Sequence, residues 1–306
     1  MQNTKNDMLY RTLCEINGAE YVLCDEPMKK HTTFRIGGPA RFFCQPGSAE
    51  QLSRTVRACE EAETPWYILG NGSNTLVSDA GYDGVVIQLF HNLEAVRIEG
   101  CLMGLEAGVL LVKAAHLAAK AGLTGLEFAS GIPGTIGGAL VMNAGAYGGE
   151  MKDVIREALV MKQDGTLLRL SREELELGYR TSIIAREGYV VLSALLELRE
   201  GNAAEIEARM QELKEARTTK QPLDYPSAGS TFKRPEGYFA GKLIMDSGLR
   251  GYRVGGAQVS EKHCGFVINT GDATAQDVMD LIAHVQKEVR EQFGVKLEME
   301  IKTLGF

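Results

Sequence analysis

Glycine dominates the stretch Gly131-Ile-Pro-Gly-Thr-Ile-Gly-Gly-Ala-Leu-Val-Met-Asn-Ala-Gly-Ala-Tyr-Gly148, where six of eighteen residues are glycine. The chain contains 35 glycines in 306 residues, so an average stretch of this length would hold about two. Because glycine lacks a Cβ, it tolerates positive φ and lets backbone N–H groups approach an anionic or planar ligand. The density therefore predicts a long loop that a large ligand approaches closely.

A second glycine-rich turn lies at Gly70-Asn-Gly-Ser-Asn74, directly after the apolar run Trp66-Tyr-Ile-Leu69. It lacks the third glycine of the G-x-G-x-x-G pattern of dinucleotide-binding folds, and Gly81 and Gly84 interrupt any helix that would follow. Two such loops favour one extended cofactor that carries phosphate. We expect its phosphates to rest on the backbone amides of a loop.

The composition is that of a globular chain, with 44% hydrophobic residues and a formal net charge of −7. An acidic balance argues against a nucleic-acid or anionic-membrane surface, which needs a field of Lys and Arg. No signal-peptide core and no run of roughly 20 apolar residues is found, so we expect a cytoplasmic protein. Six scattered cysteines without a C-x-x-C pair predict reduced thiols. No metal is expected, because the histidines lack paired ligand spacing; they are His31, His91, His116, His263 and His284.

The first third of the chain alternates strand and helix patterns. Ser48-Ala-Glu-Gln51 has the pattern of a capping box, and Leu52, Val56 and Cys59 would share one face of the helix that it opens. Strands are predicted before and after this helix, which makes a βαβ-like unit. They cover residues 41–44, 66–69 and 85–89.

The rest of the chain also carries clear helix and strand signals. Ser171-Arg-Glu-Glu174 predicts a short helix, Asn202 predicts the start of a charged helix that ends near Arg217, and Thr274-Ala-Gln-Asp277 opens a helix that Gly294 stops. Gln221–Gly229 contains two prolines and is the best domain boundary. A further helix is expected over 109–121, and strands are expected around 158–160 and 189–198.

Three polar clusters have both a structural and a functional reading. Tyr179-Arg-Thr-Ser182 fits a helix end with Arg180 exposed, and Ala228–Pro235 fits a turn in which Ser230 bonds its own backbone. Leu297-Glu-Met-Glu-Ile301 alternates like a half-buried strand, which by default puts both of its glutamates on the solvated face.

Taken together and in order, these motifs resemble the UDP-N-acetylenolpyruvoylglucosamine reductase family. The resemblance runs from about His31 to Glu300. The motifs that carry it are His31-Thr-Thr-Phe-Arg-Ile-Gly-Gly38, Gly70-Asn-Gly-Ser-Asn74, Gly131-Ile-Pro-Gly-x-x-Gly-Gly138, Asn143-Ala-Gly-Ala-Tyr-Gly148, Tyr179-Arg-x-Ser182, Arg217-Thr-Thr-Lys220, Ala228-Gly-Ser-x-Phe-Lys233 and the terminal glutamate strand.

The resemblance implies an α+β fold, with an FAD-binding domain of the vanillyl-alcohol-oxidase (PCMH) type in two subdomains and a smaller α+β substrate-binding domain. The expected divisions are residues 1–85, 86–221 and 222–303. It also implies bound FAD with NADPH as co-substrate. The expected cofactor-binding residues are Gly70, Asn71, Gly72, Ser73, Asn74, Gly131, Pro133, Gly134, Gly137, Gly138, Asn143, Ala144 and Gly145.

The implied reaction adds a hydride to C3 and a proton to C2 of the enolpyruvyl ether of UDP-N-acetylglucosamine enolpyruvate, which gives UDP-N-acetylmuramate. Hydride arrival drives negative charge onto C2 and its carboxylate, and a guanidinium can bond that carboxylate in two places. We assign this role to Arg180. Ser230 matches the family's proton donor, and Glu300 would lie on the carboxylate side of the substrate. Burial would raise the pKa of Glu300, whereas a nearby Arg180 would lower it.

Three further residues match substrate contacts of the family: Lys220 for the diphosphate, Tyr179 beside the arginine, and His263. For His263 a structural hydrogen bond is a nearly equal alternative. Arg234 stands where other members have asparagine, so no role is transferred to it. The chain resembles the shorter branch of the family, because no tyrosine-bearing insertion lies between Arg180 and Arg217. We expect a monomer with a UDP-sugar as its small-molecule partner.

Two other functions are alternatives for this sequence. An FAD-linked oxidase of the same fold would need an oxygen-reactive flavin and a base, which the serine-plus-arginine pattern does not suggest. A non-catalytic nucleotide-binding module would leave Ser230 and Glu300 without a purpose.

Overall fold

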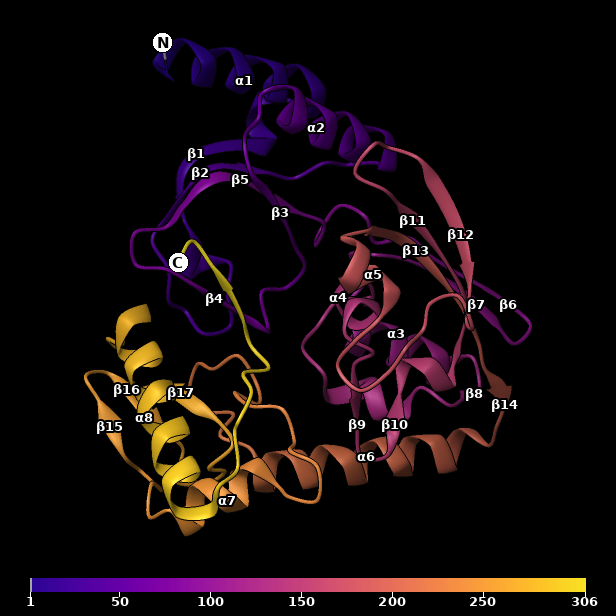
Figure 1. Ribbon diagram of the computed structural model, residues 1–306. Coiled ribbons are helices and arrows are strands. Elements are labelled where there is room, and N and C mark those ends of the chain that lie inside the picture. Colours follow the sequence, from indigo (N-terminus) through magenta and orange to yellow (C-terminus); the bar gives the residue numbers. More distant parts are fainter. Residues whose placement is uncertain (1) are drawn as a thin grey trace. The chain divides into compact units, whose positions relative to one another are not determined.

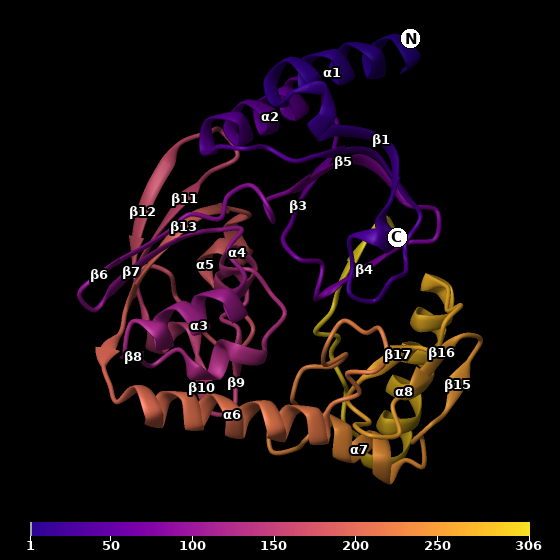
Figure 2. The same cartoon turned by 180° about the vertical axis from the view of Figure 1, so that it is seen from behind.

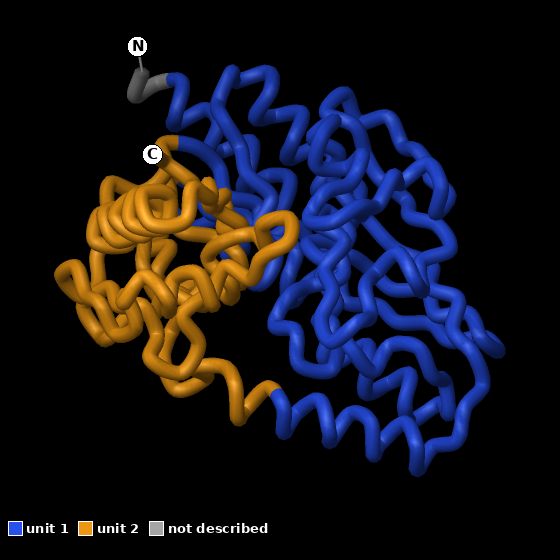
Figure 3. The backbone as a smooth tube through the Cα atoms, turned by 60° about the horizontal axis from the view of Figure 1, so that its bottom comes forward, with its two compact units in different colours: residues 1–24, 42–71, 84–216 blue, residues 25–41, 72–83, 217–306 orange. Residues whose placement is uncertain are grey.

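The computed structural model describes residues 2–306, with side chains from Lys5 onward (Figure 1). The chain forms two compact units, each built from segments that are distant in the sequence (Figure 3). Unit 1 comprises residues up to 24, 42–71 and 84–216, and unit 2 comprises residues 25–41, 72–83 and 217–306. No helix of the described residues is both long and apolar enough to cross a membrane.

The predicted βαβ-like unit is present. Strand β3 (Trp66–Leu69) pairs in parallel with β5 (Tyr82–Gln88), and β2 (Pro39–Cys44) lies on the other side of β5, next to β1 (Val22–Pro27). Helix α2 (Ala49–Glu61) connects β2 to β3. The strands of this sheet place the first glycine turn at the end of β3, beside the end of β5.

Two helices pack on this sheet near the N-terminus. The Ser48 side chain caps α2 by accepting from the Gln51 N–H, as predicted. Helix α1 (Gln2–Asn17) lies beside α2 in both views (Figures 1 and 2). Their apolar faces share one buried cluster with the strands, which includes Leu9, Leu13, Leu52, Val56, Cys59, Phe42, Val85 and Ile87.

A five-stranded antiparallel sheet forms the rest of unit 1, in the order β12-β11-β13-β7-β6. Its predicted strands are β11 (Ile155–Met161) and β13 (Val190–Glu197), and the predicted helix over 109–121 is α3 (Leu111–Lys120). The helix that Asn202 was predicted to open is α6 (Ala203–Lys220), whose first amides do donate to Asn202. The other elements are β6 (Val96–Glu99), β7 (Leu102–Glu106), β12 (Leu167–Ser171), α5 (Ile183–Glu187), and the short pair β8 (Leu123–Thr124) and β14 (Arg199–Glu200).

Two predictions of secondary structure in unit 1 were wrong. Ser171 and Glu174 exchange the two hydrogen bonds of a capping box, at 2.8 and 3.3 Å, yet they close a turn and no helix follows. The helix comes later, at α5, where Ser182 is the N-cap. The stretch 131–148 is not one long loop, because it contains helix α4 (Ile136–Val141) and the first strand of the hairpin β9 (Gly145–Ala146) and β10 (Gly149–Glu150). Local side-chain bonds fix a turn, but tertiary packing decides whether a helix continues from it.

Unit 2 is a small α+β assembly. Helix α8 (Ala275–Phe293) packs with a three-stranded antiparallel sheet of β15 (Arg253–Val254), β16 (Ala257–Val259) and β17 (Val267–Asn269) over one buried cluster. Helix α7 (Ala240–Asp246) contributes to the same cluster. A separate parallel pair joins β4 (Thr75–Val77) to β18 (Lys302–Leu304).

The predicted limits of α8 are confirmed. Thr274 and Asp277 form a complete capping box, and Gly294 ends the helix in the left-handed conformation. Asp277 Oδ2 accepts from the N–H groups of Thr274 and Gly256, at 3.0 and 3.2 Å. The hydrogen bond from the Thr274 backbone is the main reason that the pKa of Asp277 lies below its ordinary value, and these bonds outweigh the opposing effect of burial.

Asp277→Asn should destabilise unit 2 by about 1 kcal/mol at neutral pH, because the N-cap amide loses a charged acceptor. Since the folded-state pKa of Asp277 is lowered, its contribution is present above the unfolded pKa near 3.8 and is lost as the pH falls through the folded value. Denaturant unfolding should therefore show a stability difference from wild type that shrinks in acid. Asp280→Asn removes the same charge from a carboxylate whose hydrogen bond comes from a side chain, Gln276, and should cost less; equal losses from the two variants would contradict the assignment.

Candidate cofactor and substrate site

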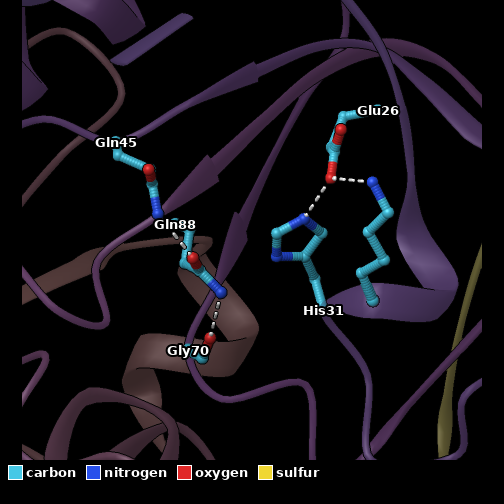
Figure 4. A network of polar contacts seen from close by, with 6 residues as sticks. Glu26, His31, Gln45, Gly70 and Gln88 are labelled. Carbon is cyan, nitrogen blue, oxygen red and sulfur yellow. Dashed lines mark hydrogen bonds and ion pairs between the residues drawn. The ribbon is translucent and has the colours of Figure 1, made fainter. Parts of the chain in front are cut away.

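The start of the first glycine turn is fixed by a buried glutamine. Gln88, at the end of β5, is 4% exposed, and its Nε2 donates to the Gly70 carbonyl at 3.4 Å (Figure 4). Its Oε1 accepts from Gln45 Nε2 at 2.9 Å. Gln88 was not predicted as a site residue, although a polar residue that ends the apolar run Val85–Ile87 was a usable signal.

The two predicted glycine stretches meet in unit 1. Asn71 Nδ2 donates to the Pro133 carbonyl at 2.6 Å. A Cβ added to Gly70 would lie 2.5 Å from Thr135 Oγ1, so only glycine fits there. Thr135, which was also not predicted, thereby shapes the turn as well as capping α4.

The N-terminus of α4 does not offer its amides to a ligand. Ile136 N–H donates to the Val109 carbonyl at 2.8 Å, and Gly137 N–H donates to the Ala107 carbonyl at 2.9 Å. Gly138 N–H reaches Thr135 Oγ1 at 3.3 Å. The amides that anions use at other helix N-termini are therefore already bonded within the protein.

The amides of the first turn are different. Among the described residues, no hydrogen bond is formed by the backbone N–H groups of Asn71, Gly72 or Ser73. Gly72 has φ +61°, and a Cβ there would overlap the His31 carbonyl oxygen. Three successive N–H groups on a tight turn, at whose centre Gly72 has no room for a Cβ, fit a phosphate-bearing cofactor.

A charged cluster supports the loop that Gly72 contacts. His31 Nε2 and Glu26 Oε1 are 2.9 Å apart, and Lys30 Nζ donates to the same oxygen at 3.3 Å (Figure 4). Burial raises the pKa of Glu26, but hydrogen bonds from His31 and Lys30 outweigh burial and lower it overall. Thr33 N–H donates to the Gly72 carbonyl at 3.2 Å, which ties the turn to this loop.

The remaining predicted cofactor residues have structural partners of their own. Asn143 is fully buried, and its side chain is bonded within the protein. A Cβ on Gly145 would lie 2.6 Å from Glu150 Cβ, so the β9–β10 hairpin itself requires glycine there. The Gly134 carbonyl accepts from Leu111 N–H at 3.0 Å. Two other predicted cofactor residues also have structural roles. Gly131 ends a 3₁₀ turn over Glu127–Gly131, and Ala144 N–H donates to the Ala139 carbonyl at 2.8 Å.

In unit 2, the structure brings Ser230 and Glu300 onto neighbouring backbone segments. Glu300 N–H donates to the Thr231 carbonyl at 2.9 Å, and Lys233 N–H donates to the Glu298 carbonyl at 2.8 Å. Ser230 is half-buried, and no hydrogen bond of its hydroxyl is found within the described residues, so the structural reading in which it bonds its own backbone is wrong.

The default placement of Glu300 is also wrong. Residues 297–301 form only an isolated bridge, between Phe232 and Met299, and β18 begins at Lys302. Glu298 is exposed as expected, but Glu300 is only 8% exposed. The segment lacks the ladder of a regular strand, so simple alternation did not predict which glutamate is buried.

The first glycine turn reaches the same place. Asn74 Nδ2 donates to the Glu300 carbonyl at 3.2 Å, and Lys302 N–H donates to the Asn74 carbonyl at 2.9 Å. Hydrogen bonds therefore join three short backbone segments: the end of the predicted cofactor turn at Asn74, the segment after Ser230, and the segment that contains Glu300.

His263 belongs to the same neighbourhood. Its Nδ1 accepts from Gly265 N–H at 3.1 Å, and the Gly265 carbonyl accepts from Thr231 N–H at 2.9 Å. Burial lowers the pKa of His263 despite a backbone hydrogen bond that acts in the opposite direction. A neutral ring whose Nδ1 is an acceptor carries its proton on Nε2, so His263 is a hydrogen-bond donor held beside the Ser230 segment.

Arg180 lies in unit 1, in a turn that precedes a helix and does not end one. Gly178 and Thr181 exchange backbone hydrogen bonds at 3.1 and 3.3 Å, and α5 begins directly afterwards. Arg180 is half-buried with φ +56°, and its guanidinium lies 5.1 Å from the centroid of the exposed Tyr179 ring. A non-glycine residue with this φ is strained, which is common at functional sites.

Two other cationic side chains are exposed. Lys220 is the last residue of α6. Arg234 packs its guanidinium 3.9 Å from the centroid of the Phe239 ring and donates to the Tyr238 carbonyl at 3.2 Å, which gives it a structural role.

Known proteins match this chain over almost its whole length. Residues 40–171 match the family model of an FAD-binding domain, and residues 221–304 match that of the C-terminal domain of UDP-N-acetylenolpyruvoylglucosamine reductase. A reductase of that name from Lachnoclostridium phytofermentans is 54% identical over 304 residues, 98% of each chain.

Solved structures extend the comparison to the fold. The enzyme of that name from Thermus caldophilus has a TM-score of 0.79 and 38% identity, over 92% of this chain and 98% of that one. p-Cresol methylhydroxylase has a TM-score of 0.50 at 12% identity, over 97% of this chain and 66% of that one, and shows a shared fold alone. The predicted fold class, an α+β flavoprotein fold of the vanillyl-alcohol-oxidase type, is confirmed. This chain belongs to the UDP-N-acetylenolpyruvoylglucosamine reductase family.

Proposed function

We propose that this protein uses NADPH and bound FAD to reduce the enolpyruvyl ether of UDP-N-acetylglucosamine enolpyruvate to UDP-N-acetylmuramate, a precursor of peptidoglycan. The observation that carries the proposal is the joining of three segments in unit 2. Backbone hydrogen bonds bring the Ser230 segment to Glu300, and Asn74 brings the glycine turn to the same residue.

The residues present fit FAD. The unpartnered N–H groups of Asn71, Gly72 and Ser73 would bond the pyrophosphate. Gly70 and Gly72 let the turn lie directly against Thr135 and the His31 carbonyl, where a Cβ would overlap. The chemistry that FAD supplies when bound is two-electron transfer from NADPH to C3 of the substrate. Gly131, Pro133, Gly134, Gly137, Gly138, Ala144 and Gly145 would shape the surrounding wall through their backbone.

Residues of the chain would stabilise the negative charge that develops on the substrate and would supply the proton for C2. Arg180 would bond the substrate carboxylate in two places, which stabilises the negative charge that hydride addition pushes onto it. Ser230 would donate its hydroxyl proton to C2. A hydroxyl is a weak acid, so the geometry must place it directly against a strongly basic carbon. The half-buried, unpartnered hydroxyl of Ser230 is suited to this.

Glu300, which is 8% exposed, would lie on the carboxylate side of the substrate. His263, with its proton on Nε2, would donate to the substrate from the next turn. Tyr179 would contact the substrate beside Arg180. Lys220, exposed on α6, would attract the diphosphate, which an acidic protein must bind through local cations.

Several broader features belong to the same proposal. We propose FAD-binding subdomains over 1–85 and 86–221, a substrate-binding domain over 222–303, membership of the shorter branch of the family, a monomeric state and a cytoplasmic location. An FAD-linked oxidase of the same fold is the second candidate, and it is favoured only by the shared fold with p-cresol methylhydroxylase.

The purified protein should be yellow, and NADPH should bleach it under anaerobic conditions. Adding UDP-N-acetylglucosamine enolpyruvate without oxygen should restore the colour within one turnover. Stopped-flow absorbance at the flavin band measures both steps. Colour that returns only with oxygen would support the oxidase, and a colourless protein that takes up no added FAD would contradict both candidates.

Gly72→Ala should weaken FAD binding, because a Cβ there overlaps the His31 carbonyl oxygen and displaces the turn. Gly237→Ala is the matched control: Gly237 also has positive φ, +74°, but a Cβ there meets nothing within 4 Å. Fluorescence titration of the apoprotein with FAD should show a Kd raised about tenfold or more for Gly72→Ala alone. Equal affinities in the two variants would contradict the role of this turn.

Ser230→Ala should leave flavin reduction by NADPH unchanged and slow flavin reoxidation by substrate about a hundredfold or more, because C2 loses its proton donor. Ser247→Ala, which removes a hydroxyl bonded only within its own helix at 2.9 Å from the Leu243 carbonyl, should leave both steps unchanged. Loss of both half-reactions to the same extent in Ser230→Ala would disprove the proton-donor role.

A further inference from the structure

We propose that Asn143 is a positioning residue for Arg180, which it holds through the Gly178 carbonyl. The inference rests on the proposed function, in which Arg180 binds the substrate carboxylate. Asn143 is expected among the cofactor-binding residues, and in the structure its side chain has three hydrogen bonds within the protein.

The Asn143 side chain lies at the centre of three hydrogen bonds. Its Nδ2 donates to Glu150 Oε2 at 2.7 Å and to the Gly178 carbonyl at 3.2 Å, and its Oδ1 accepts from Lys152 N–H at 2.9 Å. The residue is 0% exposed and has φ +45°. Both amide hydrogens are therefore used within the protein, and a buried amide in this position has nothing left to donate to a ligand.

Gly178 is the first residue of the turn that carries Arg180. Its N–H and carbonyl both bond Thr181, so the two residues between them, Tyr179 and Arg180, form the tip of the turn. Arg180 holds a left-handed φ, which is uncommon for a non-glycine residue. The hydrogen bond from Asn143 restrains the turn, because it anchors the Gly178 carbonyl from outside.

A second anchor comes from the same stretch of chain. Ser182 is fully buried, and its Oγ donates to the Val141 carbonyl at 2.7 Å while accepting from Ala185 N–H at 3.1 Å. The two ends of the turn, Gly178 and Ser182, are thus both bonded to residues 141–143. This arrangement fixes the backbone at Arg180 on both sides, as a bidentate contact with a carboxylate requires.

Glu150 orients the asparagine. It accepts from Asn143 through one oxygen and pairs with Lys152 through the other, and its backbone N–H is bonded by Asp153. The β9–β10 hairpin therefore supports Asn143, and Asn143 supports the arginine turn.

Asn143→Asp tests the inference. The aspartate would face the Glu150 carboxylate and could not donate to Gly178. We expect FAD affinity and flavin reduction by NADPH to stay at wild-type values, while flavin reoxidation by substrate slows about ten- to a hundredfold. Hydrogen exchange in the peptide 176–183 should become faster. Asn17→Asp is the matched control, because Asn17 is also buried in unit 1 and donates to the Leu13 carbonyl and Thr55, away from this turn.

The double variant Asn143→Asp/Glu150→Gln distinguishes an effect on the Arg180 turn from a general loss of stability. A glutamine at 150 can donate to the new aspartate, which restores that hydrogen bond and removes the repulsion, but Gly178 still lacks its donor. We expect the melting temperature to recover while the slow reoxidation and fast exchange remain. Reoxidation that recovers fully, or exchange at 176–183 that stays at the wild-type rate in Asn143→Asp, would overturn the inference, as would loss of FAD binding with an unchanged turn.

Failure of the proposed function would look different. If the reduced wild-type protein is not reoxidised by the UDP-sugar ether, the function is wrong whatever the variants do. The exchange rates of the 176–183 peptide need no substrate, so they still decide whether Asn143 holds the turn.

Discussion

The pairing of residues 231–233 with residues 298–300 is the constraint on which the substrate side of the molecule depends. Two backbone hydrogen bonds make it, at 2.9 and 2.8 Å. They fix a half-buried serine next to a buried glutamate, although 70 residues of sequence separate the two. Asn74 bonds the same glutamate through its carbonyl. The Glu300 side chain, which an ordinary alternating strand would leave solvated, is therefore largely buried.

Glycine acts in two ways in the glycine-rich stretches. At Gly70 and Gly72 it lets one loop approach another while successive amides stay unpartnered, which is how a protein prepares a phosphate site. At Gly145 it lets the two strands of a hairpin close on each other. The second use contributes indirectly, because that hairpin carries Glu150, the partner of Asn143. The glycine-rich stretches therefore contain both a candidate phosphate-binding turn and a hairpin that supports a neighbouring part of the site.

Local signals in the sequence predicted local structure well. The caps at Ser48, Asn202 and Thr274 depend on residues two or three positions apart, and each opens its predicted helix. The capping-box pattern at Ser171 forms its bonds without a helix: Leu175 packs into the core, but the next residue, Glu176, adopts a left-handed φ of +45° that a helix cannot continue through. Burial of Glu300 and the links from Gln88 and Thr135 depend on residues distant in sequence, so periodicity could not find them. The candidate site residues came from the family resemblance, and single residues such as Arg180 carried no such signal alone.

The most direct test of this account is the position of the enolpyruvyl group in a crystal structure of the protein with FAD and UDP-N-acetylglucosamine enolpyruvate bound. We predict that the Ser230 hydroxyl lies within about 3.5 Å of C2, with the Glu300 carboxyl beside the substrate carboxylate. An enolpyruvyl group bound away from the 230–233 and 298–300 segments would contradict the account.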